Sequence, residues 1–482
     1  MPAEVFARGS ILGKYVPARC VMAVLGSIGM AIISGLNVNL NVAMRYMVNY
    51  TAMYGAPDAA YATNSTSNRP KDGPFNWHSM MQANLLTCYF LGYLVQIPLA
   101  RIAEKFSAKW LMFFSVAFNV VPCLLTPVLA KLHYGCLILM RVLQGIGGGA
   151  SFPAMHVMIA SWTPPTERTA MSTIIYVGTY VGSALSIIMG TFLAEQWGWE
   201  SVFYVMGTPS YIWMGFWLIL IQDNPNKQRF ISPEERQMIN RSLGTEVNEE
   251  HNRAVPWKKI FKSSPFWAIL IAHTCTNFGW TMFFDIPWFI RSVLDRGFEE
   301  NNYKMCYLNL IIFMVFLGML LHYLQTNGKI SATCARKIAT SICALIPGAC
   351  LIILCFVKSN QNVVVALMTV GIVAMGAKIP GFMSNHIDIA PNFAGTLVAL
   401  TNTVATLPGI VVPIFVGVIT SDSTNIGSWL IVFGVTIVLF AIEFLVFIIF
   451  GSAREQSWNK ITEENEVEQI PLKETTKPKC EA

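Results

Sequence analysis

Residues 140–168 read MRVLQGIGGGASFPAMHVMIASWTPPTER and place one arginine in a stretch that is otherwise almost entirely apolar or small. Arg141 is followed by four glycines, a proline and a histidine before Trp162 and a Pro-Pro pair end the stretch. A charged side chain at the centre of a membrane helix costs about 2.5–3.5 kcal/mol on insertion scales, so it usually faces a cavity. Its meaning here depends on whether the surrounding chain crosses a membrane.

The composition is that of a membrane protein. Of 482 residues, 54% are hydrophobic and only 12% are charged, whereas soluble domains carry about 25% charged residues. A transmembrane helix needs about 20 apolar residues, and the chain has twelve such stretches. They predict an all-α membrane protein, and the first of them is a retained span, not a cleaved signal peptide. The predicted spans are 20–43, 80–103, 111–131, 135–161, 169–194, 201–222, 266–292, 304–325, 337–358, 362–386, 394–420 and 427–452.

A polar interval divides the spans into two sets of six. The predicted parts are an N-terminal six-helix half (1–222), a central cytoplasmic loop (223–264), a C-terminal half (265–452) and a cytoplasmic tail (453–482). Corresponding places in the halves look alike, as expected of a parallel repeat. Two pseudo-symmetric halves can rock around a site at the membrane midplane, so the plan predicts alternating access.

Basic residues predict the orientation. The interval 223–264 carries eight Lys and Arg residues, and Lys105 and Lys109 flank a short loop; cytoplasmic loops are enriched in these residues. Both termini are therefore expected in the cytoplasm, and the net charge of +6 reflects topology, not nucleic-acid binding. The first loop, about 44–79, then lies outside, where its sequons predict glycosylation of Asn49 and Asn64.

Signals of enzyme chemistry are missing from the sequence. The eleven cysteines have no metal-ligand spacing, and the chain has neither a Walker loop nor a dinucleotide fingerprint. We therefore expect no enzyme, no cofactor and no metal. The favoured function is secondary transport, and the alternative is a transport-inactive receptor or scaffold that keeps the same fold.

Seven motifs together resemble the anion:cation symporter branch of the major facilitator superfamily, which includes sialin, the vesicular glutamate transporters and the type I sodium/phosphate cotransporters. The loop ARIAEKFSAK at 100–109 resembles the superfamily's loop between spans two and three. The resemblance implies a monomer carrying a small phosphate-like or carboxylate anion, coupled to Na⁺ or H⁺, in a plasma, lysosomal or vesicular membrane. The motifs are LNVNLNVAM (36–44), FNW (75–77), GYLVQIP (92–98), RVLQGIGGGASFPAMH (141–156), SWTPPTER (161–168), WAILIAH (267–273) and NHIDIAPNFAG (385–395).

The sequence departs from this family at positions that bear on substrate and coupling. Relatives often carry an arginine where this chain has Asn37, and a glutamate where it has Gly148. Gln144 replaces a further glutamate of sialin-like members. The fold assignment survives these changes, but the identity of the anion and of the coupling ion stays open. The missing glutamate at Gly148 is the best support for the inactive alternative.

Arg141, Gln144 and Gly148 share one helical face, so an approaching side chain is expected to meet an amide and then a gap. Arg141 either faces a cavity and binds an anion with its guanidinium fork, or snorkels to the outer interface or pairs permanently with a neighbouring helix. Asn37 either donates to the substrate or bonds another helix. Gly145 and Gly149 are expected to allow close helix packing.

Asp285 and Lys378 are two further charges within spans. At 1.5 Å per residue, Arg141 and Asp285 lie about 10 Å below the outer ends of their helices and Lys378 lies about 24 Å below. An Arg141–Asp285 pair is therefore expected, with Lys378 as a second anion station; static ion pairs are the alternative. Asp285 and His156 are the coupling candidates, although an intramembrane histidine is also often only structurally hydrogen-bonded.

Overall fold

The computed structural model describes residues 16–54, 72–244, 254–293, 300–357, 361–420 and 426–459. Eleven helical segments in these ranges are long and apolar enough to cross a membrane, and the 30-residue α14 supplies the twelfth, so the twelve predicted spans are confirmed. The helices are α3 (Ala18–Met47), α4 (Tyr50–Tyr54), α5 (Ser79–Gly92), α6 (Gln96–Lys105), α7 (Ala108–Leu132), α8 (Tyr134–Trp162), α9 (Arg168–Trp197), α10 (Trp199–Gly207), α11 (Ser210–Leu220), α12 (Pro233–Leu243), α13 (Trp257–Phe261), α14 (Ser264–Val293), α15 (Glu300–Thr326), α16 (Ala332–Phe356), α17 (Gln361–Met375), α18 (Ser384–Ile389), α19 (Ala394–Thr406), α20 (Pro408–Ile419) and α21 (Ile426–Phe450).

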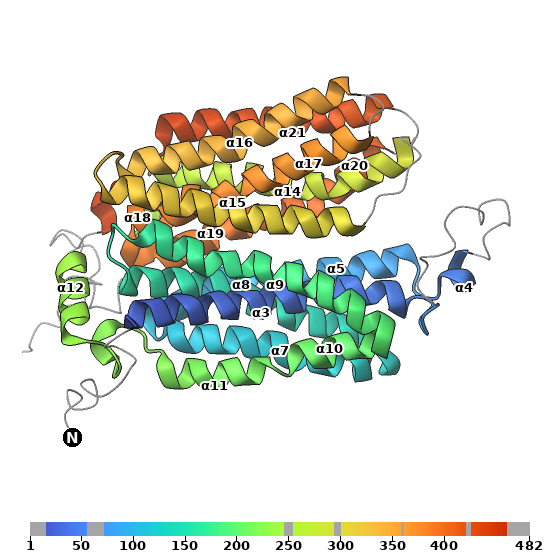
Figure 1. The fold of residues 1–482 in the computed structure, drawn as a ribbon, viewed down its shortest axis with the longest axis horizontal. Helices are drawn as coiled ribbons and strands as arrows, with labels where there is room; N and C mark the ends of the chain where they lie inside the picture. The colour runs from blue at the N-terminus through green and yellow to red at the C-terminus, as the bar shows by residue number, and fades with distance from the viewer. Residues whose placement is uncertain are drawn as a thin grey trace, which may run out of the picture.

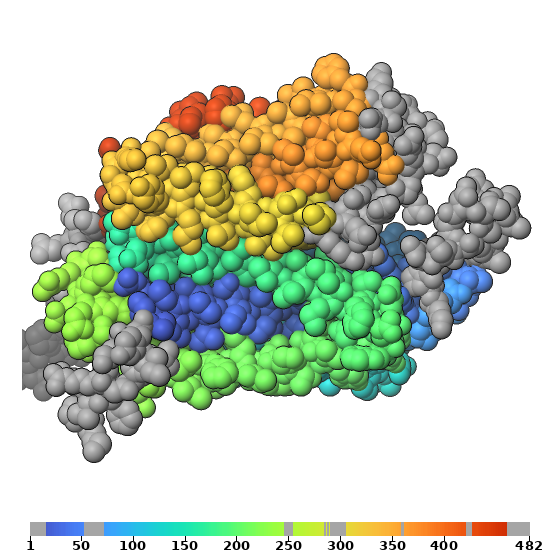
Figure 2. Space-filling view, viewed as in Figure 1, coloured from blue at the N-terminus to red at the C-terminus, as the bar shows by residue number. Residues whose placement is uncertain are grey.

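The helices form two bundles that lie side by side, α3 to α11 in one and α14 to α21 in the other (Figure 1). On the face seen in Figure 2, α15 lies along α9 at the boundary between the bundles. The short helices α12 and α4 lie at opposite ends of the long helices (Figure 1). We call the α12 end the inner end and the α4 end the outer end; the predicted orientation makes the inner end cytoplasmic.

Small residues bring α8 close to its neighbours, as predicted for Gly145 and Gly149. A Cβ atom on Gly145 would collide with the backbone carbonyl of Tyr89, and one on Gly149 would lie 3.2 Å from the Cα of Tyr93. Membrane helices associate through such close packing because lipid tails provide no hydrophobic drive between them. The glycines therefore fix α8 against the second span.

The tenth span is broken in its middle, between α17 and α18. Gly376–Lys378 forms a 3₁₀ turn and Ile379–Met383 a π-helical turn, within which Gly381 has φ −84° and ψ −124°, outside the helical region. Pro380 lacks the N–H that a regular helix needs. Non-helical backbone at membrane depth is tolerated where it lies within protein, and here it frees carbonyl groups in the interior for side chains to bind.

Hydrogen bonds between the two bundles gather toward the inner end in the part of the chain that is described. Glu104 of α6 accepts from the backbone N–H of Thr396 at 2.6 Å and from its hydroxyl at 2.7 Å. Between the same two helices, further from the inner end, Asn402 of α19 donates to Gln96 of α6 at 3.0 Å. The carboxylate at the start of α19 also complements the positive end of that helix. The structure is therefore a state closed at its inner end.

Candidate functional site

Arg141, Gln144 and Asn37 form one cluster, of which the spacing along the fourth span predicted only that Arg141 and Gln144 share a face. Arg141 is only 4% exposed. Its Nη1 donates to the side-chain oxygen of Gln144 at 2.9 Å, and its Nη2 donates to the side-chain oxygen of Asn37 on α3 at 3.0 Å. Its Nε donates to the backbone carbonyl of Leu85 at 3.3 Å, and the guanidinium lies over the ring of Tyr89, 5.0 Å from its centre.

The chemistry of this cluster suits an anion. The partners of Arg141 are two amides, a carbonyl and an aromatic face, and none of its described contacts is to a carboxylate. A guanidinium has five N–H donors, so one on each terminal nitrogen remains beyond these three bonds. The half-buried Asn37 lies beside them. The cluster is a buried positive charge whose partners leave it uncompensated within the described residues.

The gap expected at Gly148 is filled, so that expectation was wrong. A Cβ atom on Gly148 would collide with the hydroxyl of Tyr89 and lie 3.0 Å from the ring of Tyr93. The two tyrosines are one turn apart, and their ring centres are 5.3 Å apart. Sequence spacing along α8 identifies the open face, but not the aromatic pair from the second span that occupies it.

Lys378 lies apart from the Arg141 cluster, on the 3₁₀ turn of the broken tenth span. Its ammonium is 4.7 Å from the ring centre of Trp280, and that ring meets Tyr180 of the other bundle edge-to-face at 5.8 Å. Lys378 is half-buried. A second cation thus lies beside the contact between the two bundles, on the C-terminal side.

Three of the predicted residues receive little or no structural description. Asp285 belongs to α14, but its side chain lies outside the described residues, as does all of Asn64. Asn49 is half-buried, and its side-chain oxygen accepts from the backbone N–H of Ala52 at 2.8 Å. The Arg141–Asp285 pair and both glycosylation sites remain predictions.

His156 belongs to a buried polar cluster that joins the bundles. Its Nδ1 lies 2.5 Å from the hydroxyl of Tyr176, and its Nε2 lies 3.2 Å from the backbone carbonyl of Met383 in the π-helical turn. Nδ1 of His386 lies 2.8 Å from the same carbonyl oxygen. The ring centres of His156 and His386 are 5.5 Å apart. His156 therefore contacts the broken tenth span directly.

The cluster continues within the C-terminal bundle. Nε2 of His386 and Nδ1 of His273 lie 2.7 Å and 3.2 Å from the hydroxyl of Thr401. The same hydroxyl also lies 3.2 Å from the backbone carbonyl of Val398, to which it can donate its one proton, so it links the two rings either as a shared acceptor or as the donor to one of them. Along the sequence His156 is an isolated histidine, because the other two come from spans more than 100 residues away.

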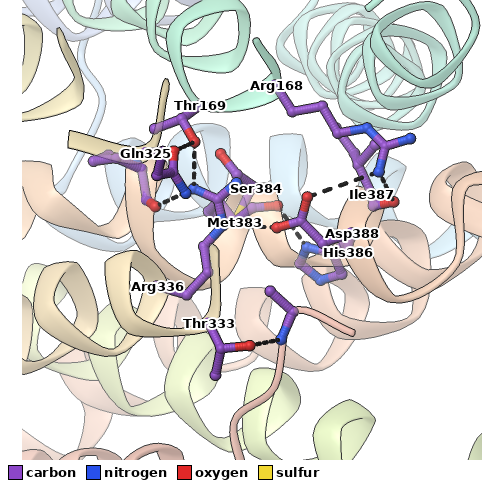
Figure 3. A network of polar contacts seen from close by, with 12 residues as sticks. Arg168, Thr169, Gln325, Thr333, Arg336, Met383, Ser384, His386, Ile387 and Asp388 are labelled. Atoms are coloured by element: carbon purple, nitrogen blue, oxygen red, sulfur yellow. Dashed lines mark hydrogen bonds and ion pairs between the residues drawn. The ribbon is translucent and has the colours of Figure 1, made fainter. Parts of the chain in front are cut away.

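A network of charges that the sequence did not assign closes the inner end (Figure 3). Asp388 of α18 accepts from Nε of Arg336 at 2.7 Å and lies 3.8 Å from Nη1 of Arg168, which belongs to the other bundle. Arg336 also donates to the hydroxyl of Thr169 at 3.0 Å and to the carbonyl of Pro380 at 2.7 Å. We call Arg168, Arg336 and Asp388 the inner latch. The motifs around 168 and 388 were visible in the sequence, but their pairing was not.

The fold and these buried cations define a multi-pass membrane transporter built from two helical bundles. The Major Facilitator Superfamily model matches residues 20–413. Human sialin is 33% identical over 92% of this chain and 90% of its own length. A putative inorganic phosphate cotransporter of Drosophila ananassae is 32% identical over 94% and 96%, and human vesicular glutamate transporter 2 is 30% identical over 92% and 75%. The chain belongs to the Major Facilitator Superfamily and, within it, to the anion:cation symporter family.

A crystal structure of the Escherichia coli fucose:proton symporter shares the fold. The two structures superpose with a TM-score of 0.60. The superposition covers 90% of this chain and 100% of the symporter chain, and the sequence identity is 14%. At that identity the likeness concerns the fold alone. The family consists of transporters, so the chain is a transporter by descent and not an enzyme.

Proposed function

We propose that this protein is a secondary active transporter of small phosphate-like or carboxylate anions, coupled to Na⁺ or H⁺ and working by alternating access. Its relatives include proteins named as carriers of phosphate and of glutamate, which supports an anionic substrate. We propose that it works in the plasma membrane or in a lysosomal or vesicular membrane.

One observation carries the proposal. Arg141 is 4% exposed and is held by amides and a carbonyl instead of a carboxylate among the described residues. A buried charge without a counter-charge is costly, and removing the cost is the thermodynamic gain that an anion brings when it binds. The fork of a guanidinium fits the paired oxygens of a carboxylate or phosphate.

The inner latch and the Glu104–Thr396 contact support alternating access. Both join the bundles at the inner end, so a path to that side requires both to separate. The alternative of a transport-inactive receptor shares the fold and the anion site. The inactive receptor differs from a transporter in one respect, because it binds the anion but does not accumulate it across the membrane.

The decisive experiment measures uptake into proteoliposomes. Purified protein is tested with radiolabelled inorganic phosphate, glucuronate and glutamate, under a Na⁺ gradient, a pH gradient and a membrane potential applied separately. Accumulation that collapses with an ionophore supports transport. Binding of an anion without accumulation under any gradient would establish the inactive receptor instead.

Two variants make the experiment specific to the site. Arg141→Lys keeps the charge but loses the planar fork, so uptake is expected to fall by about tenfold or more at unchanged expression. Arg241→Lys, on the exposed face of α12, is the matched control and should transport like the parent. Equal uptake by both variants would remove Arg141 from the anion site.

A further inference from the structure

A carboxylic acid lies deep within the twelfth span, at a place that the Arg141 cluster does not use. Glu443 of α21 is 0% exposed. Its Oε1 accepts a hydrogen bond from the hydroxyl of Thr276 on α14 at 2.7 Å. Its Oε2 is buried and has no hydrogen-bond partner among the described residues. An ionisable residue within a span is by default a candidate functional group, because burying it is expensive.

The surroundings of Glu443 do not neutralise a negative charge there. Among the described residues, the titratable side chains near it are Cys343 of α16, whose Sγ lies 3.6 Å from the hydroxyl of Thr276, Cys275, which precedes Thr276 on α14, and Lys378 in the broken tenth span. Of these only Lys378 is a cation. Its ammonium lies over the ring of Trp280 and not on the free Oε2. A buried carboxylate without a bound cation is neutral when it carries a proton, which is the form that this arrangement favours.

Lys378 and Glu443 are nevertheless connected. Cys343 lies between them: its Sγ is 3.6 Å from the hydroxyl of Thr276 and 3.7 Å from the carbonyl of Met375, where the tenth span breaks. Lys378 also lies at the contact with the other bundle, through Trp280 and Tyr180. The buried acid and the half-buried base are thus linked through Thr276, Cys343 and the turn that follows Met375 in the C-terminal bundle.

We propose that Glu443 is the proton-binding site of the transport cycle and that Lys378 is its alternating partner. The assignment rests on the anion transport proposed above and selects H⁺ over Na⁺ as the coupling ion. In the loaded carrier the anion binds the Lys378 ammonium, and Oε2 of Glu443 holds the proton. In the empty carrier the proton has left for the aqueous phase on the open side, and the carboxylate pairs with Lys378.

Charge balance explains why the two ligands move together. The loaded site holds an anion, an ammonium and a protonated acid, and the empty site holds an ammonium and a carboxylate. A singly charged anion therefore leaves each form of the site with no net charge. A carrier with only one of the two ligands has an uncompensated buried charge, which is costly. Anion and proton consequently tighten each other's binding by the same factor.

The test replaces Glu443→Gln, which keeps an oxygen for Thr276 and mimics the protonated acid. The probe is whichever of inorganic phosphate, glucuronate and glutamate the parent protein exchanges fastest in proteoliposomes. Accumulation driven by a pH gradient should fall about tenfold or more, while anion counterflow falls by no more than about threefold, because only the proton step is lost. Glu195→Gln, a carboxylate on the exposed outer part of α9, is the matched control and should behave like the parent.

Proton binding has its own readout, independent of transport. Infrared difference spectra of the purified protein between acid and alkaline pH should contain a protonated-carboxyl band that disappears in Glu443→Gln and persists in Glu195→Gln. If the band behaves in this way but the parent shows no counterflow, the proton site stands and the transport proposal fails. A spectrum that is the same in the parent and in Glu443→Gln overturns the inference, as does full pH-driven accumulation by that variant.

A second variant covers the case in which Glu443→Gln does not insert. Thr276→Val removes the hydroxyl that stabilises the ionised carboxylate, so the pH of half-maximal accumulation should move upward. An unmoved pH profile in Thr276→Val would overturn the inference.

Discussion

Removing the charge of Asp388 should open the inner end of the protein. Asp388 is 7% exposed and lies between the buried guanidinium groups of Arg168 and Arg336. Asp388→Asn removes the carboxylate charge that both guanidiniums contact. The contact with Arg336 lies within one bundle, so it stabilises the closed and open states alike. The contact with Arg168, at 3.8 Å, joins the bundles, so a separation of the bundles at the inner end must break it.

The magnitude follows from that one contact. At 4 Å and an effective dielectric constant of 20, the Coulomb attraction of two unit charges is about 4 kcal/mol, and desolvation opposes most of it. A net loss of about 1–2 kcal/mol shifts the ratio of closed to open states about five- to thirtyfold. The repulsion between the two guanidiniums that remain acts in the same direction, because water enters an open inner end and screens them.

Spin-label distances measure this shift. Labels at Phe106→Cys and Asn327→Cys, in exposed loops at the inner ends of the two bundles, should move apart in Asp388→Asn, in a background without reactive native cysteines. Asp223→Asn is the matched control: this carboxylate also lies at the inner end, but it accepts from Ser107 and Lys109 of its own bundle. Identical distance distributions in the parent and in Asp388→Asn would refute the latch.

Three further predictions concern the interior. Lys378→Gln should raise the KM for the anion about tenfold; an unchanged KM in counterflow would exclude Lys378 as an anion station. Gly148→Glu, which restores the residue of relatives, should lower thermal stability by about 1–3 kcal/mol because the Tyr89 hydroxyl occupies the space; Tyr89→Ala should rescue it, and no rescue would contradict the clash. Tyr176→Phe removes a hydroxyl 2.5 Å from His156 and should cost about 1 kcal/mol of stability in a thermal melt; an unaltered melt would argue against that hydrogen bond.

The fold was predictable from the sequence because a membrane span is a local property. A run of about 20 apolar residues identifies a transmembrane helix without reference to the rest of the chain. Arg141 and Gln144 were predictable as neighbours for the same reason, since three residues along a helix bring side chains onto one face. The contact of Asn37 with Arg141 was not predictable in this way: the two residues are 104 positions apart, and only the structure places the Asn37 oxygen 3.0 Å from Arg141.

The contacts that close the protein were not predictable in this way. In the inner latch, Arg168 donates to the carbonyl of Ile387, 219 positions away, and no periodicity encodes such a pairing. Arg336 was placed just before a predicted span that began at 337, although α16 begins at Ala332 and buries it. Glu443 did carry a local signal, an acid in an apolar run. Its hydrogen bond with Thr276 depends on how α14 and α21 pack.

The broken tenth span provides a physical route between the ion sites and the inner latch. Arg336 binds the break at one point and α18 at another: its Nη1 donates to the carbonyl of Pro380, and its Nε donates to Asp388. Lys378 ends the 3₁₀ turn and Pro380 lies in the π-helical turn that follows it directly, so the proposed movement of the ammonium from Trp280 toward Glu443 would act on the break that Arg336 binds. A regular helix would leave the Pro380 carbonyl less accessible, because it would bond within the helix. On the proposal above, the break connects Lys378 to the arginine that holds Asp388 at the inner end.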